Sequence, residues 1–209
     1  MKYLKKNIYR TLVITVCLLG MSTSNSTAQS HIRLDYDLSY TFGNTNDFIS
    51  AVSTRGGTFG FGHHLSDMFS IGLKVGLHSF SETFEKDVYL DDNVSIYGMQ
   101  RRYINSFPIL LTGKYNLTYD TKAIPYIEIG AGPYYFQMRR ETGLFNYTNE
   151  YNWNFGFQPE IGLMIEVNES LRLNVNTSYH YILENQSIES QSYFNFGAGI
   201  MIYNMEGTY

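Results

Sequence analysis

The chain has 209 residues with 15 basic and 19 acidic side chains, a formal net charge of −4, and 16% aromatic residues. This length corresponds to one domain, and the acidic balance argues against a nucleic-acid partner. No stretch after the N-terminal segment approaches about eighteen consecutive apolar residues, which excludes membrane-spanning helices.

The N-terminal segment, residues 1–28, has the parts of a secretory signal peptide: a basic start, an apolar run at 12–19 and small residues at the cleavage site. The apolar run is about half of the roughly 20 residues that a spanning helix requires, so cleavage is favoured over a membrane anchor. Cleavage removes Cys17, the only cysteine. The mature domain, residues 29–209, is therefore expected to fold without disulfides.

The mature chain begins with an alternation of apolar and polar side chains over the eleven residues 32–42. Side chains on a strand point alternately to its two faces, so this run requires one apolar and one polar environment. Eleven residues at about 3.3 Å each, tilted by about 40°, project roughly 28 Å, close to the roughly 25 Å apolar band of an outer-membrane barrel. The run predicts a strand of such a barrel.

Seven further strands are predicted in chain order, at residues 56–65, 68–80, 103–115, 124–138, 153–167, 171–181 and 194–202. The links after the second, fourth and sixth strands are brief, whereas the others have about 12, 22, 14 and 7 residues. This sorting is typical of short periplasmic turns and longer extracellular loops, with both termini periplasmic. The predicted fold is all-β: an eight-stranded antiparallel up-and-down transmembrane β-barrel.

A soluble lipocalin-like barrel, with its apolar faces turned inward around a ligand, is the alternative fold, because alternation alone does not tell inside from outside. Aromatic-rich strand ends, the sorted loop lengths and glycine on the polar face favour the membrane barrel.

The most barrel-like segments are residues 108–111, 125–132, 156–166 and 194–199. In them the chain resembles the small outer-membrane β-barrel superfamily that includes the OmpX-like, OmpW-like and OmpA-barrel proteins. The resemblance implies insertion into the outer membrane of a Gram-negative envelope by the barrel assembly machinery, and it specifies no activity. Members usually end on an aromatic residue of the last strand, whereas six residues follow Tyr203 here. Tyr209 supplies that assembly signal only if the strand continues or the tail folds back.

Charged side chains recur on the polar faces of the predicted strands, and the interior of an eight-stranded barrel is filled by side chains. A turn centred on residue 169 would place Arg172 opposite Glu166 and Ser178 opposite Glu160. Because buried charges require partners, we interpret the row as a salt-bridged plug, with a proton or ion path as the alternative. The predicted interior network comprises Arg33, Asp35, Asp37, Lys74, Lys114, Glu128, Glu160, Glu166, Arg172 and His180.

Ser178, His180 and Glu160 form the best catalytic constellation, and some eight-stranded outer-membrane barrels are lipid A acylases or deacylases. All three lie on the polar face, away from the lipid from which an acyl chain would arrive. We therefore predict a non-enzymatic protein with no catalytic residue, cofactor or metal site. A lipid A-modifying enzyme is an alternative.

Two arginine pairs, Arg101 with Arg102 and Arg139 with Arg140, are predicted to meet at the extracellular mouth, because their strands flank a turn near residue 120. Lipopolysaccharide phosphates lie at that height, and arginine binds phosphate bidentately, so the four are candidates for a lipid-phosphate clamp. Outer-membrane lipid and lipopolysaccharide are the partners this implies. The alternative is neutralisation by nearby acidic residues: Glu85, Asp87, Asp91, Asp92 or Glu141.

The leading functional prediction is a small envelope barrel whose loops contact surface ligands or partners, especially the second loop, 81–102, and a third loop with Leu144, Phe145 and Tyr147. An OmpW-like carrier of small hydrophobic compounds is the alternative. It requires an apolar tunnel near the outer mouth, whereas the inward positions assigned from the sequence are mainly polar.

Overall fold

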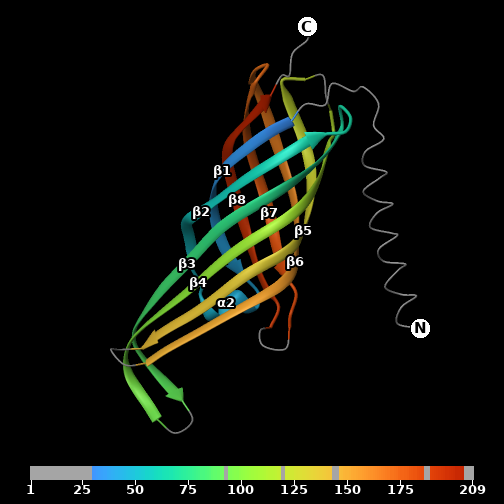
Figure 1. Cartoon of the computed structure of the whole chain (residues 1–209). Helices are drawn as coiled ribbons and strands as arrows, with labels where there is room; N and C mark the ends of the chain where they lie inside the picture. The colour runs from blue at the N-terminus through green and yellow to red at the C-terminus, as the bar shows by residue number, and fades with distance from the viewer. Residues whose placement is uncertain (1–29, 92–93, 119–120, 143–145, 186–188, 205–209) are drawn as a thin grey trace, which may run out of the picture.

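The computed structural model describes residues 30–91, 94–118, 121–142, 146–185 and 189–204, without the side chains of 86–98, 142–150 and 204. These residues form one closed antiparallel sheet in which each strand pairs with its chain neighbours and β1 pairs with β8 (Figure 1). The predicted eight-stranded up-and-down barrel is thereby confirmed. Its elements are β1 (Ser30–Phe42), α2 (Asn44–Phe48), β2 (Val52–His64), β3 (Phe69–Asp91), β4 (Val94–Asn116), β5 (Ala123–Thr142), β6 (Asn146–Asn168), β7 (Leu171–Ile182) and β8 (Gln191–Asn204).

The two ends of the barrel differ. Ser30 pairs with Asn204 at one end, here called the terminus end, and the brief β2–β3, β4–β5 and β6–β7 links lie there too. The opposite end, here called the loop end, carries α2 and the long β3–β4 hairpin, which extends beyond the other strands (Figure 1).

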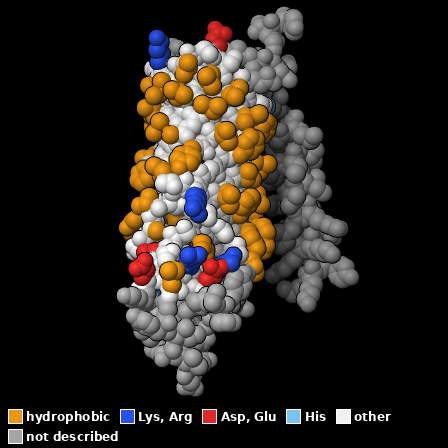
Figure 2. Space-filling model, turned by 90° about the vertical axis from the view of Figure 1, so that its left-hand side faces the viewer, with side chains coloured by type: hydrophobic (Ala, Val, Ile, Leu, Met, Phe, Trp, Pro, Cys, Tyr) orange, Lys and Arg blue, Asp and Glu red, His pale blue; other side chains and the backbone are white. Residues whose placement is uncertain are grey.

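Apolar side chains face outward around the wall. On β1, Ile32, Leu34 and Tyr36 are 46%, 56% and 55% exposed, whereas the intervening Arg33 and Asp35 are buried. Hydrophobic side chains spread over the wall between the two polar ends (Figure 2). The lipocalin-like alternative, which requires the apolar rows to be enclosed, is therefore wrong.

The strands from β3 to β6 are longer than the sequence predicts. The β3–β4 ladder continues from Ser81 opposite Tyr103 to Asp91 opposite Val94. The predicted second loop, 81–102, is thus mainly a two-stranded extension. Beyond Ser79 the exposed outward side chains of β3 are polar (Ser81, Thr83 and Glu85) while Phe80 points inward, so the apolar-outward pattern of the strand ends although the backbone pairing continues.

The third predicted loop is corrected in the same way, because β5 reaches Thr142 and β6 starts at Asn146. Tyr147 lies on β6, whereas Leu144 and Phe145 lie outside the described residues.

Glycine on β8 makes room for interior carboxylates. A Cβ atom at Gly199 would lie 2.4 Å from Oδ1 of Asp35, and one at Gly197 would lie 2.7 Å from Oδ1 of Asp37. Both positions therefore exclude larger residues, because the acidic side chains lie directly against the β8 backbone.

Some sequence predictions concern residues that are not described. The signal peptide, residues 1–28, and the terminal Tyr209 lie outside the described residues, and both predictions stay open. No helix in the described part of the chain is long and apolar enough to cross a membrane.

Candidate functional site

The middle of the barrel interior holds an ion-pair network. Glu128 on β5 lies directly opposite Glu160 on β6, and two cations from the other side of the barrel separate their charges. Arg33 Nη1 lies 2.7 Å from Glu160 Oε1, and Lys74 Nζ lies 2.7 Å from Glu160 Oε2. Lys74 also pairs with Glu128, and Arg33 with Asp35. These side chains are at most 7% exposed, so the network is a salt-bridged filling.

Neutral side chains complete this network. The Tyr126 hydroxyl lies 2.8 Å from Glu160 Oε1 and 2.9 Å from Asn174 Oδ1. Asn174 in turn donates to Asp35 at 3.0 Å, and Gln158 donates to Glu160 at 3.1 Å. The carboxylates are therefore held by hydrogen bonds as well as by ion pairs, which offsets part of the cost of burying them.

A histidine layer lies next to the network on the side of the loop end. His78 contacts Asp37 Oδ2 through Nε2 and the Tyr193 hydroxyl through Nδ1, both at 3.1 Å. His180 stacks on Tyr193 with ring centroids 4.4 Å apart. Asn195 Nδ2 joins the two imidazoles, at 2.8 Å from His78 Nε2 and 3.1 Å from His180 Nε2.

The constellation considered for catalysis is part of this filling. Ser178 Oγ lies 3.4 Å from His180 Nε2, a nitrogen that Asn195 also contacts. Glu160 is held by Arg33 and Lys74. Because Ser178, His180 and Glu160 are each less than 5% exposed, an acyl chain could reach them only by displacing packed side chains.

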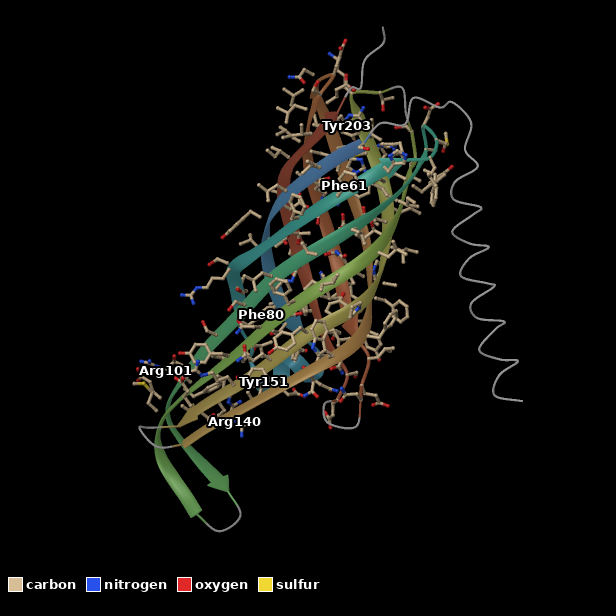
Figure 3. All side chains as sticks on the ribbon, in the orientation of Figure 1. Phe61, Phe80, Arg101, Arg140, Tyr151 and Tyr203 are labelled. Atoms are coloured by element: carbon tan, nitrogen blue, oxygen red, sulfur yellow. The ribbon has the colours of Figure 1, made fainter. Side chains whose placement is uncertain are left out.

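An apolar layer, which the sequence analysis missed, follows toward the loop end. Its fully buried side chains are Ile49, Phe80, Ile104, Leu110, Tyr134, Phe136, Ile182 and Tyr193. Phe80, labelled in Figure 3, shares the inward phase of Lys74 and His78 on β3. Phe80, Ile104, Leu110, Tyr134 and Phe136 lie on the inward phase of the predicted strands, and Ile182 and Tyr193 lie one residue beyond them, so following that phase to the strand ends would have found all of the layer except Ile49.

The segment around α2 closes this layer at the loop end. Gly43 has a φ of 57°, in the left-handed region, and turns the chain from β1 into α2. Ile49 is fully buried in the apolar layer, and its carbonyl accepts a 2.6 Å hydrogen bond from Thr41 Oγ1. Thr45 bonds to Gln191 on β8 at 2.8 Å, and the Ser50 amide donates to Glu82 on β3 at 2.7 Å. We call residues 43–51 the mouth plug.

The four candidate arginines lie on two faces of the wall. The predicted pairing is present, since Arg102 lies opposite Arg140. Adjacent residues on a strand point to opposite sides, so Arg101 and Arg139 share the outward phase of Phe107 and Tyr135, whereas Arg102 and Arg140 point inward. The four arginines therefore do not form one clamp on one face of the wall. Binding of lipid phosphate stays a prediction.

The inward arginines hold the mouth plug. The Arg102 guanidinium lies 5.4 Å from the Phe48 ring centroid and that of Arg140 lies 5.3 Å from it. Arg102 also donates to the Phe48 carbonyl at 3.1 Å. On the outer face Arg139 pairs with Glu141, one of the acidic residues considered for neutralisation, and lies 5.7 Å from the Tyr103 ring.

Two residues of the predicted interior network lie at the rim of the terminus end. Arg172 is opposite Glu166 as predicted, but its Nη2 is 3.7 Å from Glu166 Oε2, and the Glu166 side chain is 39% exposed. Both side chains belong to the inward-facing set of their strands. Because β6 ends at Asn168 and β7 begins at Leu171, both lie at the open end of the barrel, where water reaches them. The other eight predicted residues are buried: Arg33, Asp35, Asp37, Lys74, Lys114, Glu128, Glu160 and His180.

Solved structures share this fold. Neisserial surface protein A aligns with 86% of this chain and 99% of its own, at 12% identity and a TM-score of 0.56. The N-terminal β-barrel domain of Pseudomonas aeruginosa OprF aligns with 87% of this chain and 100% of its own, at 13% identity and a TM-score of 0.50. No protein-family model matches the sequence, and no curated protein matches it. At this identity the likeness establishes the fold of small outer-membrane barrels.

Proposed function

We propose that the protein is a non-enzymatic integral barrel of the outer membrane, with its terminus end in the periplasm and its loop end outside the cell. One observation carries the proposal: the wall is apolar outward over its whole circumference while the interior is filled with paired charges. In water such a wall would expose an apolar surface far larger than soluble monomers tolerate. In a bilayer the same wall faces acyl chains, and the closed sheet leaves no edge unpaired in the hydrocarbon.

The filled interior supports an anchoring or surface-contact role over solute diffusion. Ion pairs, the histidine layer, the apolar layer and the mouth plug follow one another along the barrel axis. A general pore would need these layers to part, at the cost of breaking buried ion pairs. Insertion by the barrel assembly machinery is part of the proposal.

The outer face near the loop end is suited to lipopolysaccharide. Tyr135 lies 5.2 Å from Trp153 and 6.2 Å from Tyr151, ring to ring, as in the aromatic girdle of an outer-membrane barrel. Arg139 follows Tyr135 by four residues, roughly 13 Å along β5. Arg101 on β4 lies opposite Glu141 and is exposed. We therefore assign lipid-phosphate contact to the outward pair, Arg101 and Arg139, and plug retention to the inward pair.

Two measurements test the proposal. The folded chain should stay in detergent extracts of outer membranes and migrate faster on gels before boiling than after it; a water-soluble product would overturn the membrane assignment. For the phosphate contact, Arg101→Ala with Arg139→Ala should weaken lipopolysaccharide binding. The matched control, Arg102→Ala with Arg140→Ala, should bind it as the wild type does. Equal affinity of both double variants would remove the outward pair from the proposal.

The apolar layer supports a second candidate function, carriage of small hydrophobic compounds. It supplies the apolar section near the outer mouth that such a carrier needs, and the mouth plug would have to move to admit a ligand. Uptake of a hydrophobic dye into vesicles separates the candidates: the anchoring role predicts uptake no faster than through empty vesicles, and a carrier predicts saturable uptake.

A further inference from the structure

Near the terminus end, a small cavity lies inside the wall formed by β2, β3 and β4. We propose that it binds a halide-sized monovalent anion, with chloride as the physiological candidate and Lys114 as its principal charge. The cavity offers about 20 Å³ to the centre of a water-sized sphere, and one such molecule needs roughly 10–15 Å³. The site therefore has room for a single small ion. Phe61, labelled in Figure 3, marks its height on the wall.

Glycine creates the space. Gly62 on β2 pairs with Gly72 on β3, and Gly72 pairs in turn with Thr112 on β4, so the wall itself carries no side chain larger than threonine there. The His31 ring lies against Gly62, where a Cβ atom would be 2.4 Å away, so the free space is at Gly60. A Cβ atom at Gly60 would meet its nearest neighbour only at 3.6 Å, which is ordinary contact distance. A methyl group at Gly60 would therefore fit without displacing a neighbour.

The charges that line the cavity favour an anion. Arg33, Lys74, Lys114 and Glu128 line it. Asp35 and Glu160, just outside the lining, pair with Arg33, and Glu160 also pairs with Lys74, which leaves Lys114 as the cation without a carboxylate in contact. Glu128 is already paired with Lys74. Lys114 is 2% exposed, and no carboxylate of the described residues lies within 4 Å of its ammonium group. A buried ammonium without a contacting anion is costly, and a bound anion would lower that cost.

The present neighbours of the Lys114 ammonium are weak substitutes for an anion. It lies 3.2 Å from His31 Nε2, 3.7 and 3.9 Å from the sulfur atoms of Met201 and Met164, and 5.7 Å from the centroid of the Tyr126 ring. Thioether sulfur is a poor acceptor. Since an ammonium has three donors and no acceptor, His31 satisfies only one of them well.

Two further donors around the cavity lack acceptors. Ser70 Oγ is buried without a hydrogen-bond partner, and so is His31 Nδ1. Because His31 Nε2 accepts from the ammonium, Nδ1 of the neutral ring carries the proton and is a donor. Ser70 and His31 are 1% and 6% exposed, so bulk water does not satisfy them. Buried donors without acceptors, beside an ammonium group that no carboxylate contacts, distinguish an anion site from a cavity that holds only water.

Crystals of the refolded full chain soaked in bromide test the site directly. We expect an anomalous peak within hydrogen-bond distance of Lys114 Nζ. Solution binding is measured as the chloride dependence of urea unfolding in detergent, against gluconate at equal ionic strength. At a chloride concentration ten times the dissociation constant, the unfolding equilibrium constant should fall about elevenfold.

Variants make the test specific. Lys114→Met keeps a long side chain beside the two methionines and removes the charge, so the chloride effect should vanish. Gly60→Ala places a methyl group in the cavity and should weaken the effect severalfold. Gly113→Ala is the matched control, because its methyl group would lie outside the barrel, 3.8 Å from the Phe69 ring. Should Lys114→Met fail to fold, the comparison of Gly60→Ala with Gly113→Ala still tests the site, because only the first places a methyl group in the cavity.

The proposal is overturned if wild-type protein shows neither a bromide peak nor a chloride effect, which would leave water as the occupant. It is also overturned if the effect persists unchanged in Lys114→Met, or if both alanine variants lose it equally.

Discussion

Removing the charge of Glu160 tests the ion-pair network most severely. Its carboxylate meets Arg33 and Lys74 at 2.7 Å each, and it accepts from Tyr126 at 2.8 Å. Breaking one partner of a buried ion pair costs about 3–5 kcal/mol. Arg33 keeps Asp35 and Lys74 keeps Glu128 as second partners. We therefore expect the lower end of the range for Glu160→Gln, about 3 kcal/mol, which is roughly a hundredfold in the unfolding constant.

Glu166→Gln is the matched control for this experiment, because it removes the same charge from the same inward phase of β6, near the end of the strand at Asn168. The Glu166 carboxylate lies 3.7 Å from Arg172 and is 39% exposed, so the expected loss is at most about 1 kcal/mol. Urea unfolding in detergent micelles, followed by the fluorescence of Trp153 and by gel mobility without boiling, measures both variants. Equal losses, or a loss below about 1 kcal/mol for Glu160→Gln, would refute a stabilising plug.

Three further predictions concern the mouth plug, the wall and the outer face. Ile49→Ala leaves a cavity in the apolar layer and should cost about 2–4 kcal/mol, with faster proteolysis within residues 43–51 as the second readout. Gly132→Ala places a Cβ atom 2.2 Å from the Ile109 carbonyl oxygen and should lower the urea midpoint, whereas Gly113→Ala should leave it unchanged; similar midpoints would contradict the packing described. Ile129 is 62% exposed on the apolar wall, so Ile129→Arg should lower the free energy of unfolding in vesicles by about 2–4 kcal/mol. Ser81→Arg, beyond the apolar part of β3, should leave that free energy unchanged.

The sequence predicts the barrel where the strands separate an apolar from a polar environment. On β1, exposed apolar and buried polar residues alternate without exception from Ile32 to Thr41, so both the strand and the buried positions of Arg33, Asp35 and Asp37 follow from the pattern. The same reasoning placed Lys74 and Glu160 correctly, although the pairing between them joins strands that are not neighbours in the sheet and needs the closed barrel.

The strand extensions and the mouth plug at the loop end were not predicted from the sequence, and the reason is physical. Beyond Ser79 the outward positions of β3 carry polar side chains while Phe80 points inward, so the pairing continues without the apolar-outward pattern of the rest of the strand. The mouth plug depends on contacts with distant strands, such as Thr45 with Gln191, which no local pattern encodes. The sequence alone could have predicted that the arginines point to two different faces, because adjacent strand residues such as Arg101 and Arg102 point to opposite sides.

Lipid exposure of Trp153 tests the central claim most directly. It is the only tryptophan of the chain, lies on the outer face of β6, and is 60% exposed. Folded into bilayers whose acyl chains carry bromine close to the headgroups, the protein should lose most of its tryptophan fluorescence relative to unlabelled lipid. Unchanged fluorescence, with the barrel folded and bound to the vesicles, would contradict an apolar wall that faces lipid.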